Sequence, residues 1–391
     1  MGSNLLDKLK KQNYHLRNFN FKLVLYVVIL SVIGILMVNS ATKNEVETGL
    51  LTTTVKQVIG VIGGIIIMLI VATINYRALL RWTPVLYIIN IAVLAYLLIF
   101  ANDVMGAKRW IHVPGLGTIQ PSEFTKIVMI MTATVFIMKF KDKISRIGTL
   151  LLYMVVVLPP AILVLEEPDL STTLVILFTV ILALFVGGIS YKWVLGVLGV
   201  MIPLAGAFLI LIHQPDQTVL NMIFKDHQME RINGYFFPDE FPDQVRQQRN
   251  SVMAIGSGML TGKGLNTSTY ESVKNGSFLS EQQCDFIFAV VGEELGFVGS
   301  CVVILLIGLI VFECIRMAGK SRDEEGRLLS SAVGGLFAFQ SFVNIGVATQ
   351  IIPNTGLPLP FVSAGLSSLI SSFIMIGIVL NVGLQRKKYD F

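Results

Sequence analysis

Residues 281–297 read EQQCDFIFAVVGEELGF. This stretch places three carboxylates, those of Asp285, Glu293 and Glu294, at the start of a long apolar segment that follows a long polar loop. An ionisable side chain at membrane depth is energetically costly, so its presence there indicates a functional site. Asp285, where the loop meets the apolar segment, is therefore the first candidate for chemistry.

The composition of the chain is that of a membrane protein. Hydrophobic residues make up 54% of the 391 positions and charged residues 14%, whereas soluble domains have about 25% charged residues. Runs of about 20 apolar residues, the length that crosses a bilayer as a helix, recur along the chain. They lie near residues 23–41, 55–74, 79–100, 122–138, 148–165, 170–187, 193–212, 286–315, 329–349 and 361–384. The sequence predicts an all-α polytopic membrane protein with about ten transmembrane helices and a long, partly helical extracytoplasmic loop.

The chain is predicted to form a single membrane domain, residues 1–391, with both termini in the cytoplasm. An even number of spans places the termini on one side. Most Lys and Arg residues of the short loops fall on that side, as the positive-inside rule requires of the cytoplasmic face. The short loops opposite hold only Lys43, Lys56, Lys108 and Arg109. We therefore expect a cytoplasmic segment at 1–22, an extracytoplasmic loop at 213–285 and a cytoplasmic tail at 385–391.

A cluster of charged residues lies in and after the loop at 101–121. Lys108 and Arg109 precede the fourth span, which Pro121 is placed to begin. Glu123 and Lys126 are three residues apart and so are neighbours on one helix face. One interpretation is an ion pair that only fixes helix packing. The other adds Lys108 and Arg109 and predicts a cationic cluster that binds a phosphate.

A second exterior feature is the acidic turn at 166–169, Glu-Glu-Pro-Asp. Pro168 followed by Asp169 is typical of a helix end and the N-cap of the next helix. The alternative is that the carboxylates face the cationic cluster or bind a divalent cation. Glu167 and Asp169 are then the candidate ligands, and Mg²⁺ or Mn²⁺ the candidate ion. No other cofactor is indicated.

The loop at 213–285 is much longer than an ordinary connection, and loops of that size are usually functional or contain their own helices. Its segment 246–264 combines an amphipathic helix pattern with a glycine-rich turn. Lys263 is followed by Gly264, which does not match a nucleotide-binding Walker loop. We expect the glycines to let the backbone approach a sugar or phosphate, with plain flexibility as the alternative.

A fourth feature, residues 353–368, reads PNTGLPLPFVSAGLSS and leads into the last span. Irregular backbone at membrane depth is tolerated only where it is buried in protein or lines a wet cavity. The segment therefore predicts a broken helix beside the active site. Ser363 and Ser367 are its candidate substrate-binding residues.

Together these segments resemble one family along nearly the whole chain. The matching motifs are GAKRW at 106–110, QPSEFTK at 120–126, AIGSG at 254–258, DFIFAVVGEELGF at 285–297 and LPFVSAGLSS at 359–368. They resemble the SEDS family (shape, elongation, division and sporulation), to which RodA, FtsW and SpoVE belong. One departure is visible, because the family's usual Ser-Tyr-Gly-Gly-Ser-Ser has Ala364 and Leu366 at its second and fourth positions here. That change alters the shape of a tight turn and removes no ionisable group.

The resemblance implies a peptidoglycan glycosyltransferase of the bacterial cytoplasmic membrane. Such an enzyme polymerises lipid II into β-1,4-linked glycan, releases undecaprenyl diphosphate and works with a class B penicillin-binding transpeptidase. The motifs are common to elongation, division and sporulation proteins and do not separate these roles.

The chemistry of that reaction gives the residues their expected roles. Lipid II is an α-linked diphosphate and the product is β-linked, so the configuration inverts and one general base suffices. Asp285 is the expected base for the acceptor 4-hydroxyl. Lys108, Arg109 and Lys126 would stabilise the departing diphosphate, with Glu123 holding Lys126 in place. The lipid tail requires a site that opens sideways between helices.

Three other functions compete with this one. The polar residues could line the path of a lipid II flippase or transporter, with Asp285 as a coupling site. The chain could also be a non-catalytic scaffold for the transpeptidase. A third alternative, another polyprenyl-phosphate glycosyltransferase such as an O-antigen ligase, is disfavoured by the motif set.

Overall fold

The structure, a computed structural model, describes residues 18–43, 52–100, 109–113, 117–214, 217–223, 226–266 and 282–385. Its long helices are α2 (Phe21–Ala41), α3 (Thr53–Thr73), α4 (Tyr76–Phe100), α5 (Pro121–Lys139), α6 (Ile147–Glu166), α7 (Leu170–Val186), α8 (Tyr191–Ile212), α12 (Ile287–Gly319), α13 (Glu324–Ala348) and α14 (Leu366–Leu384). Nine of these described helices are long and apolar enough to cross a membrane, and the apolar α7 is shorter, at 17 residues. Each of the ten predicted spans therefore corresponds to a helix.

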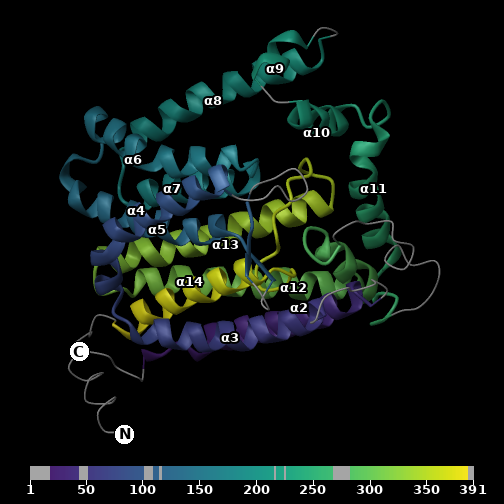
Figure 1. Ribbon diagram of the computed structural model, residues 1–391, viewed down its shortest axis with the longest axis horizontal. Coiled ribbons are helices and arrows are strands. Elements are labelled where there is room, and N and C mark those ends of the chain that lie inside the picture. Colours follow the sequence, from purple (N-terminus) through teal and green to yellow (C-terminus); the bar gives the residue numbers. More distant parts are fainter. Residues whose placement is uncertain are drawn as a thin grey trace, which may run out of the picture.

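The long helices pack around a buried centre (Figure 1). Most of the membrane-spanning window is buried in α5 (78%), α13 (67%) and α14 (78%). Helix α14 lies against α3, where Gly64 faces the Phe373 ring and Gly377 faces the Met68 carbonyl. Small residues at such contacts allow close helix packing in a membrane, where van der Waals contact drives association.

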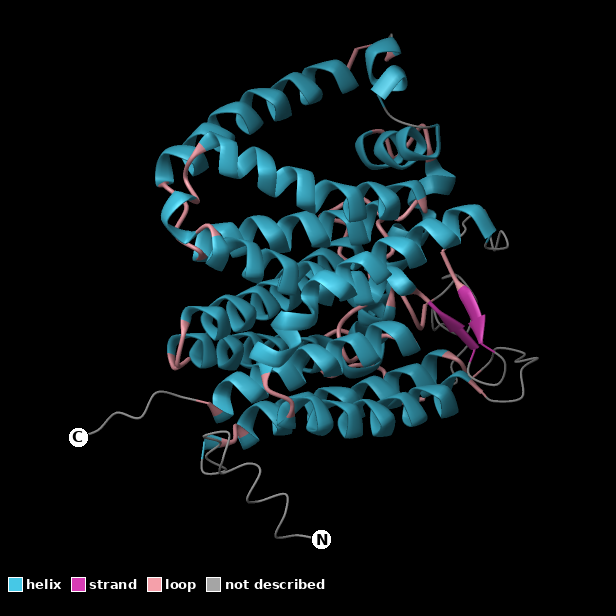
Figure 2. Cartoon of the chain, turned by 60° about the vertical axis from the view of Figure 1, so that its left-hand side comes forward, coloured by secondary structure: helices cyan, strands magenta, loops and turns pink. Residues whose placement is uncertain are grey.

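Helix α8 differs from the rest because only 6% of its spanning window is buried. Figures 1 and 2 both show it apart from the other long helices. Its one buried residue, Ile212, packs with Leu220 and Met229 in a small core separate from the main one. A helix that is apolar on nearly every face and exposed on nearly every face is suited to lipid contact.

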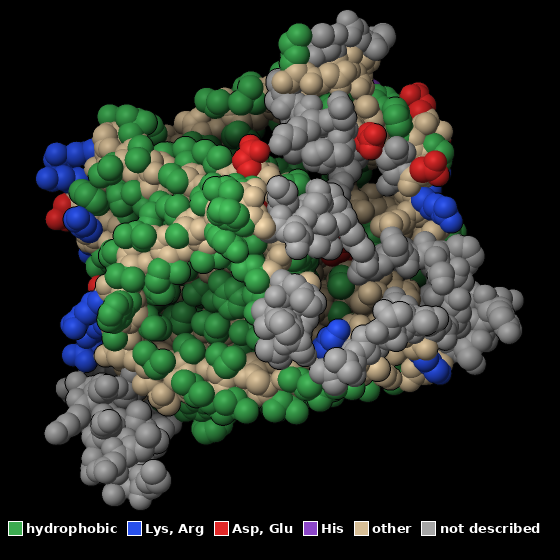
Figure 3. All heavy atoms as spheres, in the orientation of Figure 1, with side chains coloured by type: hydrophobic (Ala, Val, Ile, Leu, Met, Phe, Trp, Pro, Cys, Tyr) green, Lys and Arg blue, Asp and Glu red, His purple; other side chains and the backbone are tan. Residues whose placement is uncertain are grey.

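The start of α2 and the end of α14 lie at one end of the bundle. Asn20 donates a 2.8 Å hydrogen bond to Glu313 near the end of α12, and Met317 of α12 packs against Gly383. An even number of spans requires this arrangement. Figure 3 shows an apolar surface between the two ends, with Lys and Arg side chains gathered at the left-hand end, where α14 finishes.

The opposite end carries the irregular segments. A short antiparallel hairpin, β1 (Ile111–Val113) and β2 (Gly117–Ile119), precedes α5 and was not predicted. The long loop contains α9 (Thr218–Ile223), α10 (Asp226–Phe236) and α11 (Pro242–Ser257), which confirms that it is partly helical. Helix α11 is the amphipathic helix predicted before the glycine-rich turn.

Candidate active site

Asp285 lies in the turn that enters α12, two residues before the helix begins. It is half-buried, and its backbone carbonyl accepts a 2.9 Å hydrogen bond from the side-chain Nδ2 of Asn344 in α13. A Cβ added at Gly356 would lie 3.1 Å from the Asp285 carboxylate oxygen Oδ2. The absence of a side chain at Gly356 therefore lets the backbone there lie directly against this carboxylate.

Gly356 belongs to an irregular segment, residues 353–365, here named the strap. The strap is joined to the Asp285 turn at two points. Ser363 Oγ donates to the Cys284 carbonyl at 2.6 Å and accepts from the Leu359 amide at 2.7 Å. The Ala364 amide donates to the Gln283 carbonyl at 2.8 Å. Ser363 thus holds backbone in the structure, and substrate contact by its hydroxyl stays a prediction.

The prediction of a broken helix at 353–368 was wrong. The strap is not helical, and α14 begins after it, at Leu366 rather than near 361. Three prolines between 353 and 360 prevent a helical hydrogen-bond ladder. Side chains of α13 and Ser363 satisfy strap backbone groups instead, which is the condition under which irregular backbone survives at this depth.

The Glu123 and Lys126 pair predicted from sequence is confirmed. The Lys126 ammonium lies 2.8 Å from Glu123 Oε2, and their side chains are 1% and 4% exposed. Pro121 is the first residue of α5, as expected, so both charges fall in its first two turns. Lys126 Nζ also donates to Gln340 Oε1 at 3.2 Å, and the Ser371 hydroxyl donates to Glu123 at 3.3 Å. The cation is thus held by two partners.

The remaining candidates for anion binding are placed unequally. Lys108 lies outside the described residues. Arg109 is half-buried two residues before β1, and its Nε is buried with no hydrogen-bond partner in the described part of the chain. Ser367 Oγ accepts a 2.9 Å hydrogen bond from the backbone N–H of Gln120, which ties the start of α5 to the start of α14. Whether Arg109 and Ser367 contact substrate stays a prediction.

The acidic turn has the predicted local structure. Helix α6 ends at Glu166, and Asp169 is the N-cap of α7, with Oδ1 accepting from the Thr172 amide at 3.0 Å. Asp169 Oδ2 accepts from Gln120 Nε2 at 2.8 Å. Glu167 is fully buried, and neither of its oxygens has a hydrogen-bond partner among the described residues.

Within the residues that it describes, the structure offers no third ligand for a metal ion bound by Glu167 and Asp169. Among the described ranges, no three His, Cys, Asp or Glu side chains lie together as a metal-binding group. Burial and the nearby Asp169 charge raise the pKa of the Glu167 carboxyl to about 8, against a smaller opposing effect of Arg109. A neutral acid at pH 7 is a weak ligand for Mg²⁺ or Mn²⁺, so binding of either ion here would require proton release.

Replacement of Glu167 by Gln is expected to change how stability depends on pH. The native carboxyl binds its proton more tightly than the unfolded one, whose pKa is near 4.5, so wild-type stability falls as pH rises from about 4.5 to about 8. The amide does not titrate. We therefore expect the melting temperature of Glu167→Gln, relative to wild type, to rise across this window and to level off above it.

Thermal unfolding of purified protein in detergent between pH 5 and 9 measures this difference. Glu166→Gln is the matched control, because Glu166 is the exposed neighbour in the same turn. Its melting curves should run parallel to wild type. A melting-temperature difference for Glu167→Gln that is constant with pH would contradict a buried, neutral Glu167.

Helix α12 contains a break that was not predicted from the sequence. Gly296 has φ 66° and ψ −162°, which interrupts the helix after Glu294 and Leu295. The glycine-rich turn fills the gap: the Lys263 and Gly264 amides donate to the Glu293 and Glu294 carbonyls at 2.9 and 3.0 Å. A Cβ at Gly262 would collide with the Glu294 carbonyl. These glycines therefore allow close contact with α12. The expected approach of their backbone to a sugar or phosphate stays a prediction.

Glu293 and Glu294, the carboxylates near the end of the opening stretch, serve this junction. Glu293 is 1% exposed and pairs with Lys263 at 2.8 Å. Glu294 is also buried and accepts from the Ser40 hydroxyl of α2. They fasten α12 to the turn and to α2, so Asp285 is the one of the three that is half-exposed at the end of the bundle.

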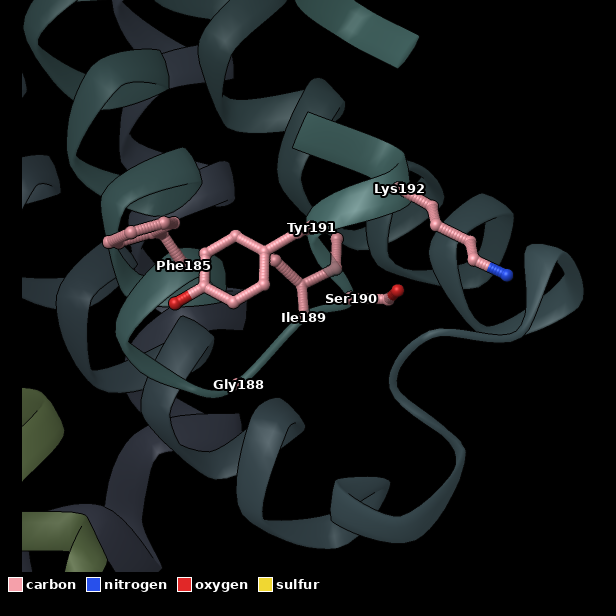
Figure 4. A pocket seen from close by; sticks show the side chains of 6 residues that line it. All are labelled: Phe185, Gly188, Ile189, Ser190, Tyr191 and Lys192. Carbon is pink, nitrogen blue, oxygen red and sulfur yellow. The ribbon is translucent and has the colours of Figure 1, made fainter. Parts of the chain in front are cut away.

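A separate cavity of about 520 Å³ lies between α7 and α8 (Figure 4). Its lining includes Phe185, Ser190, Tyr191 and Lys192. It adjoins the end of α7, whereas Asp169 and Ser171 stand at the beginning of that helix. None of the predicted site residues that the structure describes lines it.

Comparison with known proteins identifies the relatives of this chain. Residues 21–388 match the model of the FtsW, RodA and SpoVE family, described as cell cycle proteins. The chain belongs to this family. A probable peptidoglycan glycosyltransferase FtsW of Trichlorobacter lovleyi is 33% identical over 98% of this chain and 97% of its own length. The peptidoglycan glycosyltransferase MrdB of Escherichia coli K12 is 32% identical over 83% and 84%.

Solved structures of the FtsW, RodA and SpoVE fold agree. A chain of a peptidoglycan synthase complex that coordinates polymerization and crosslinking superposes with a TM-score of 0.74 at 26% identity, covering 93% of this chain and 97% of that one. RodA of Thermus thermophilus gives a TM-score of 0.66 at 25% identity, covering 95% and 98%.

In this family member, several site residues were not anticipated from sequence. Gln340 and Asn344 of α13 contact Lys126 and the Asp285 turn, and Gln120 joins Asp169 to the start of α5. The available signal was the presence of two amide side chains four residues apart within a largely apolar span, since buried amides are unfavourable unless hydrogen-bonded.

Proposed function

We propose that this chain polymerises lipid II into β-1,4-linked glycan with release of undecaprenyl diphosphate. Relatives named peptidoglycan glycosyltransferases match 98% and 83% of its length. The observation that carries the proposal is the position of Asp285, a half-buried carboxylate at the start of a membrane helix, against the backbone of Gly356. A carboxylate in such a place is suited to accept a proton.

The chemistry follows from inversion at the donor sugar. The acceptor 4-hydroxyl oxygen bonds to C1 of the donor from the face opposite the diphosphate, its proton passes to the Asp285 carboxylate, and the bond from C1 to the diphosphate oxygen breaks. The leaving diphosphate carries the negative charge. Lys126 and Arg109 are the described cations proposed to stabilise it, and Lys108 the third.

The partner and the membrane follow from the same relationship. We infer that a class B penicillin-binding transpeptidase crosslinks the strands, because a similar solved chain belongs to a complex that coordinates polymerization and crosslinking. The proposed location is the bacterial cytoplasmic membrane with both termini in the cytoplasm. The Lys and Arg distribution favours this orientation.

The orientation predicts which positions a membrane-impermeant thiol reagent reaches on intact cells. Cysteine at Thr118 in β2 or at Met259 beside α12 should be labelled, whereas cysteine at Lys141 or Arg322 should not. The parent chain, with Cys284, Cys301 and Cys314, gives the background. Labelling of the last two positions with protection of the first two would reverse the proposed topology.

The direct test of function is polymerisation of lipid II by the purified protein, alone and with its transpeptidase partner. Glycan formed by the protein alone supports the proposal in full. Glycan that needs the partner, and that persists when the partner's transpeptidase site is blocked, also supports it. No glycan in either case, with lipid II moving across liposomes that contain the chain, would favour the flippase alternative.

A further inference from the structure

Helix α13 presents two amide side chains, Gln340 and Asn344, one helical turn apart toward the site. Both are 1% exposed. Burying a polar amide in apolar surroundings without hydrogen bonds costs about 1–3 kcal/mol on the evidence of protein mutations. The hydrogen bonds of both amide nitrogens and of Gln340 Oε1 offset this cost in part.

Asn344 joins the Asp285 turn to the strap. Its Nδ2 donates to the Asp285 carbonyl at 2.9 Å and to the Leu357 carbonyl at 2.6 Å. Gly356, the strap residue that faces the Asp285 carboxylate, directly precedes Leu357. One amide nitrogen thus fixes both the backbone that bears the carboxylate and the backbone that packs against it.

Gln340 makes the corresponding connection on the cationic side. Its Oε1 accepts from Lys126 Nζ at 3.2 Å, and its Nε2 donates to the Pro358 carbonyl at 2.9 Å. Pro358 follows Leu357 in the strap. The two amides of α13 therefore hold neighbouring strap carbonyls while one reaches the Asp285 turn and the other reaches the Lys126 ammonium.

We propose that this amide pair sets the placement of base and cation relative to each other, with Asn344 a positioning residue for Asp285 and Gln340 a positioning residue for Lys126. The inference rests on the proposed glycosyl transfer. Asn344 acts through the Asp285 backbone, and a displacement of about 1 Å at a reacting group lowers a rate by about 10²-fold. Loss of the Asn344 amide should therefore lower kcat and leave binding of lipid II nearly unchanged.

The test compares Asn344→Ala with Asn381→Ala. Asn381 is also a buried asparagine, and its Nδ2 donates to the Ala72 carbonyl at 2.7 Å, but it lies at the opposite end of the bundle, one helix turn from Gln385. Both variants should melt below wild type. Rates are measured over a range of lipid II concentrations at equal concentrations of folded protein. Asn344→Ala should then have a kcat about 100-fold lower than wild type and an unchanged KM. Asn381→Ala should keep the wild-type kcat.

Gln340→Leu is the second variant, and it tests the positioning role of the α13 amides if Asn344→Ala does not fold. It keeps the side-chain bulk and the Glu123 to Lys126 pair while removing both amide hydrogen bonds, and it should also lower kcat at constant KM. Equal kcat in the α13 variants and Asn381→Ala, or a change in KM alone, would overturn the inference.

Asp285→Asn separates this outcome from failure of the proposed function. If Asp285→Asn polymerises lipid II normally, the base itself is misassigned. If it is inactive while Asn344→Ala and Gln340→Leu match Asn381→Ala, only the positioning role is wrong.

Discussion

Asp285→Asn is expected to lower lipid II polymerisation by roughly 10²- to 10⁴-fold, the usual contribution of a general base. The amide has the shape of the carboxylate but cannot take the proton of the acceptor hydroxyl. The hydrogen bond from Asn344 goes to the Asp285 backbone, so it is unaffected by the substitution. We therefore expect the variant to fold and to bind lipid II. Product formed by purified protein at saturating lipid II measures the loss.

Asp239→Asn is the control for this substitution. Asp239 lies on the same long loop, with a side chain 93% exposed and paired with Arg249 at the surface. Its removal should leave polymerisation within about twofold of wild type, because exposed ion pairs contribute little. A normal rate in Asp285→Asn, with folding and partner binding intact, would refute the enzyme mechanism. Loss of lipid II movement across liposomes would instead assign Asp285 to transport.

Local patterns in the sequence predicted most of the helices and part of the site. Apolar runs of bilayer length predicted the ten helices, because in lipid only a helix forms all its backbone hydrogen bonds within a single segment. The spacing of Glu123 and Lys126 gave their ion pair because residues three apart share a helix face. Pro168 and Asp169 gave the end of α6 and the cap of α7 by their backbone chemistry.

The features that were missed depend on contacts between distant segments. Nothing local to α13 says that Asn344 reaches the Asp285 carbonyl, 59 residues earlier in the chain. Helix α12 can break at Gly296 because the turn near Gly262 makes hydrogen bonds to the backbone groups that the break leaves free. In the sequence, a glycine within an apolar run resembles an ordinary small packing residue. The strap was correctly marked as irregular, but its conformation is set by partners in the Asp285 turn and on α13.

Exchange of the two charges in the buried pair, Glu123→Lys with Lys126→Glu, is expected to abolish polymerisation. The attraction within the pair survives the exchange, yet the ammonium leaves the position where Gln340 Oε1 accepts from it. A carboxylate at 126 would face that oxygen unless the Gln340 amide turned, and turning would break its bond to the Pro358 carbonyl. A diphosphate would also meet a negative charge where it had met a positive one.

The pair Glu313 and Arg316 provides the matched control for that exchange. It has the same spacing, with 2.9 Å between Arg316 Nη1 and Glu313 Oε1, and lies at the other end of the bundle. Glu313→Arg with Arg316→Glu should polymerise lipid II at a near-normal rate per folded molecule. If the exchange at 123 and 126 does the same, the pair only packs α5 into the bundle and Lys126 has no part in the reaction. If that exchange alone is inactive in folded protein, the ammonium is required at position 126, because attraction between the two helix positions is present in both variants.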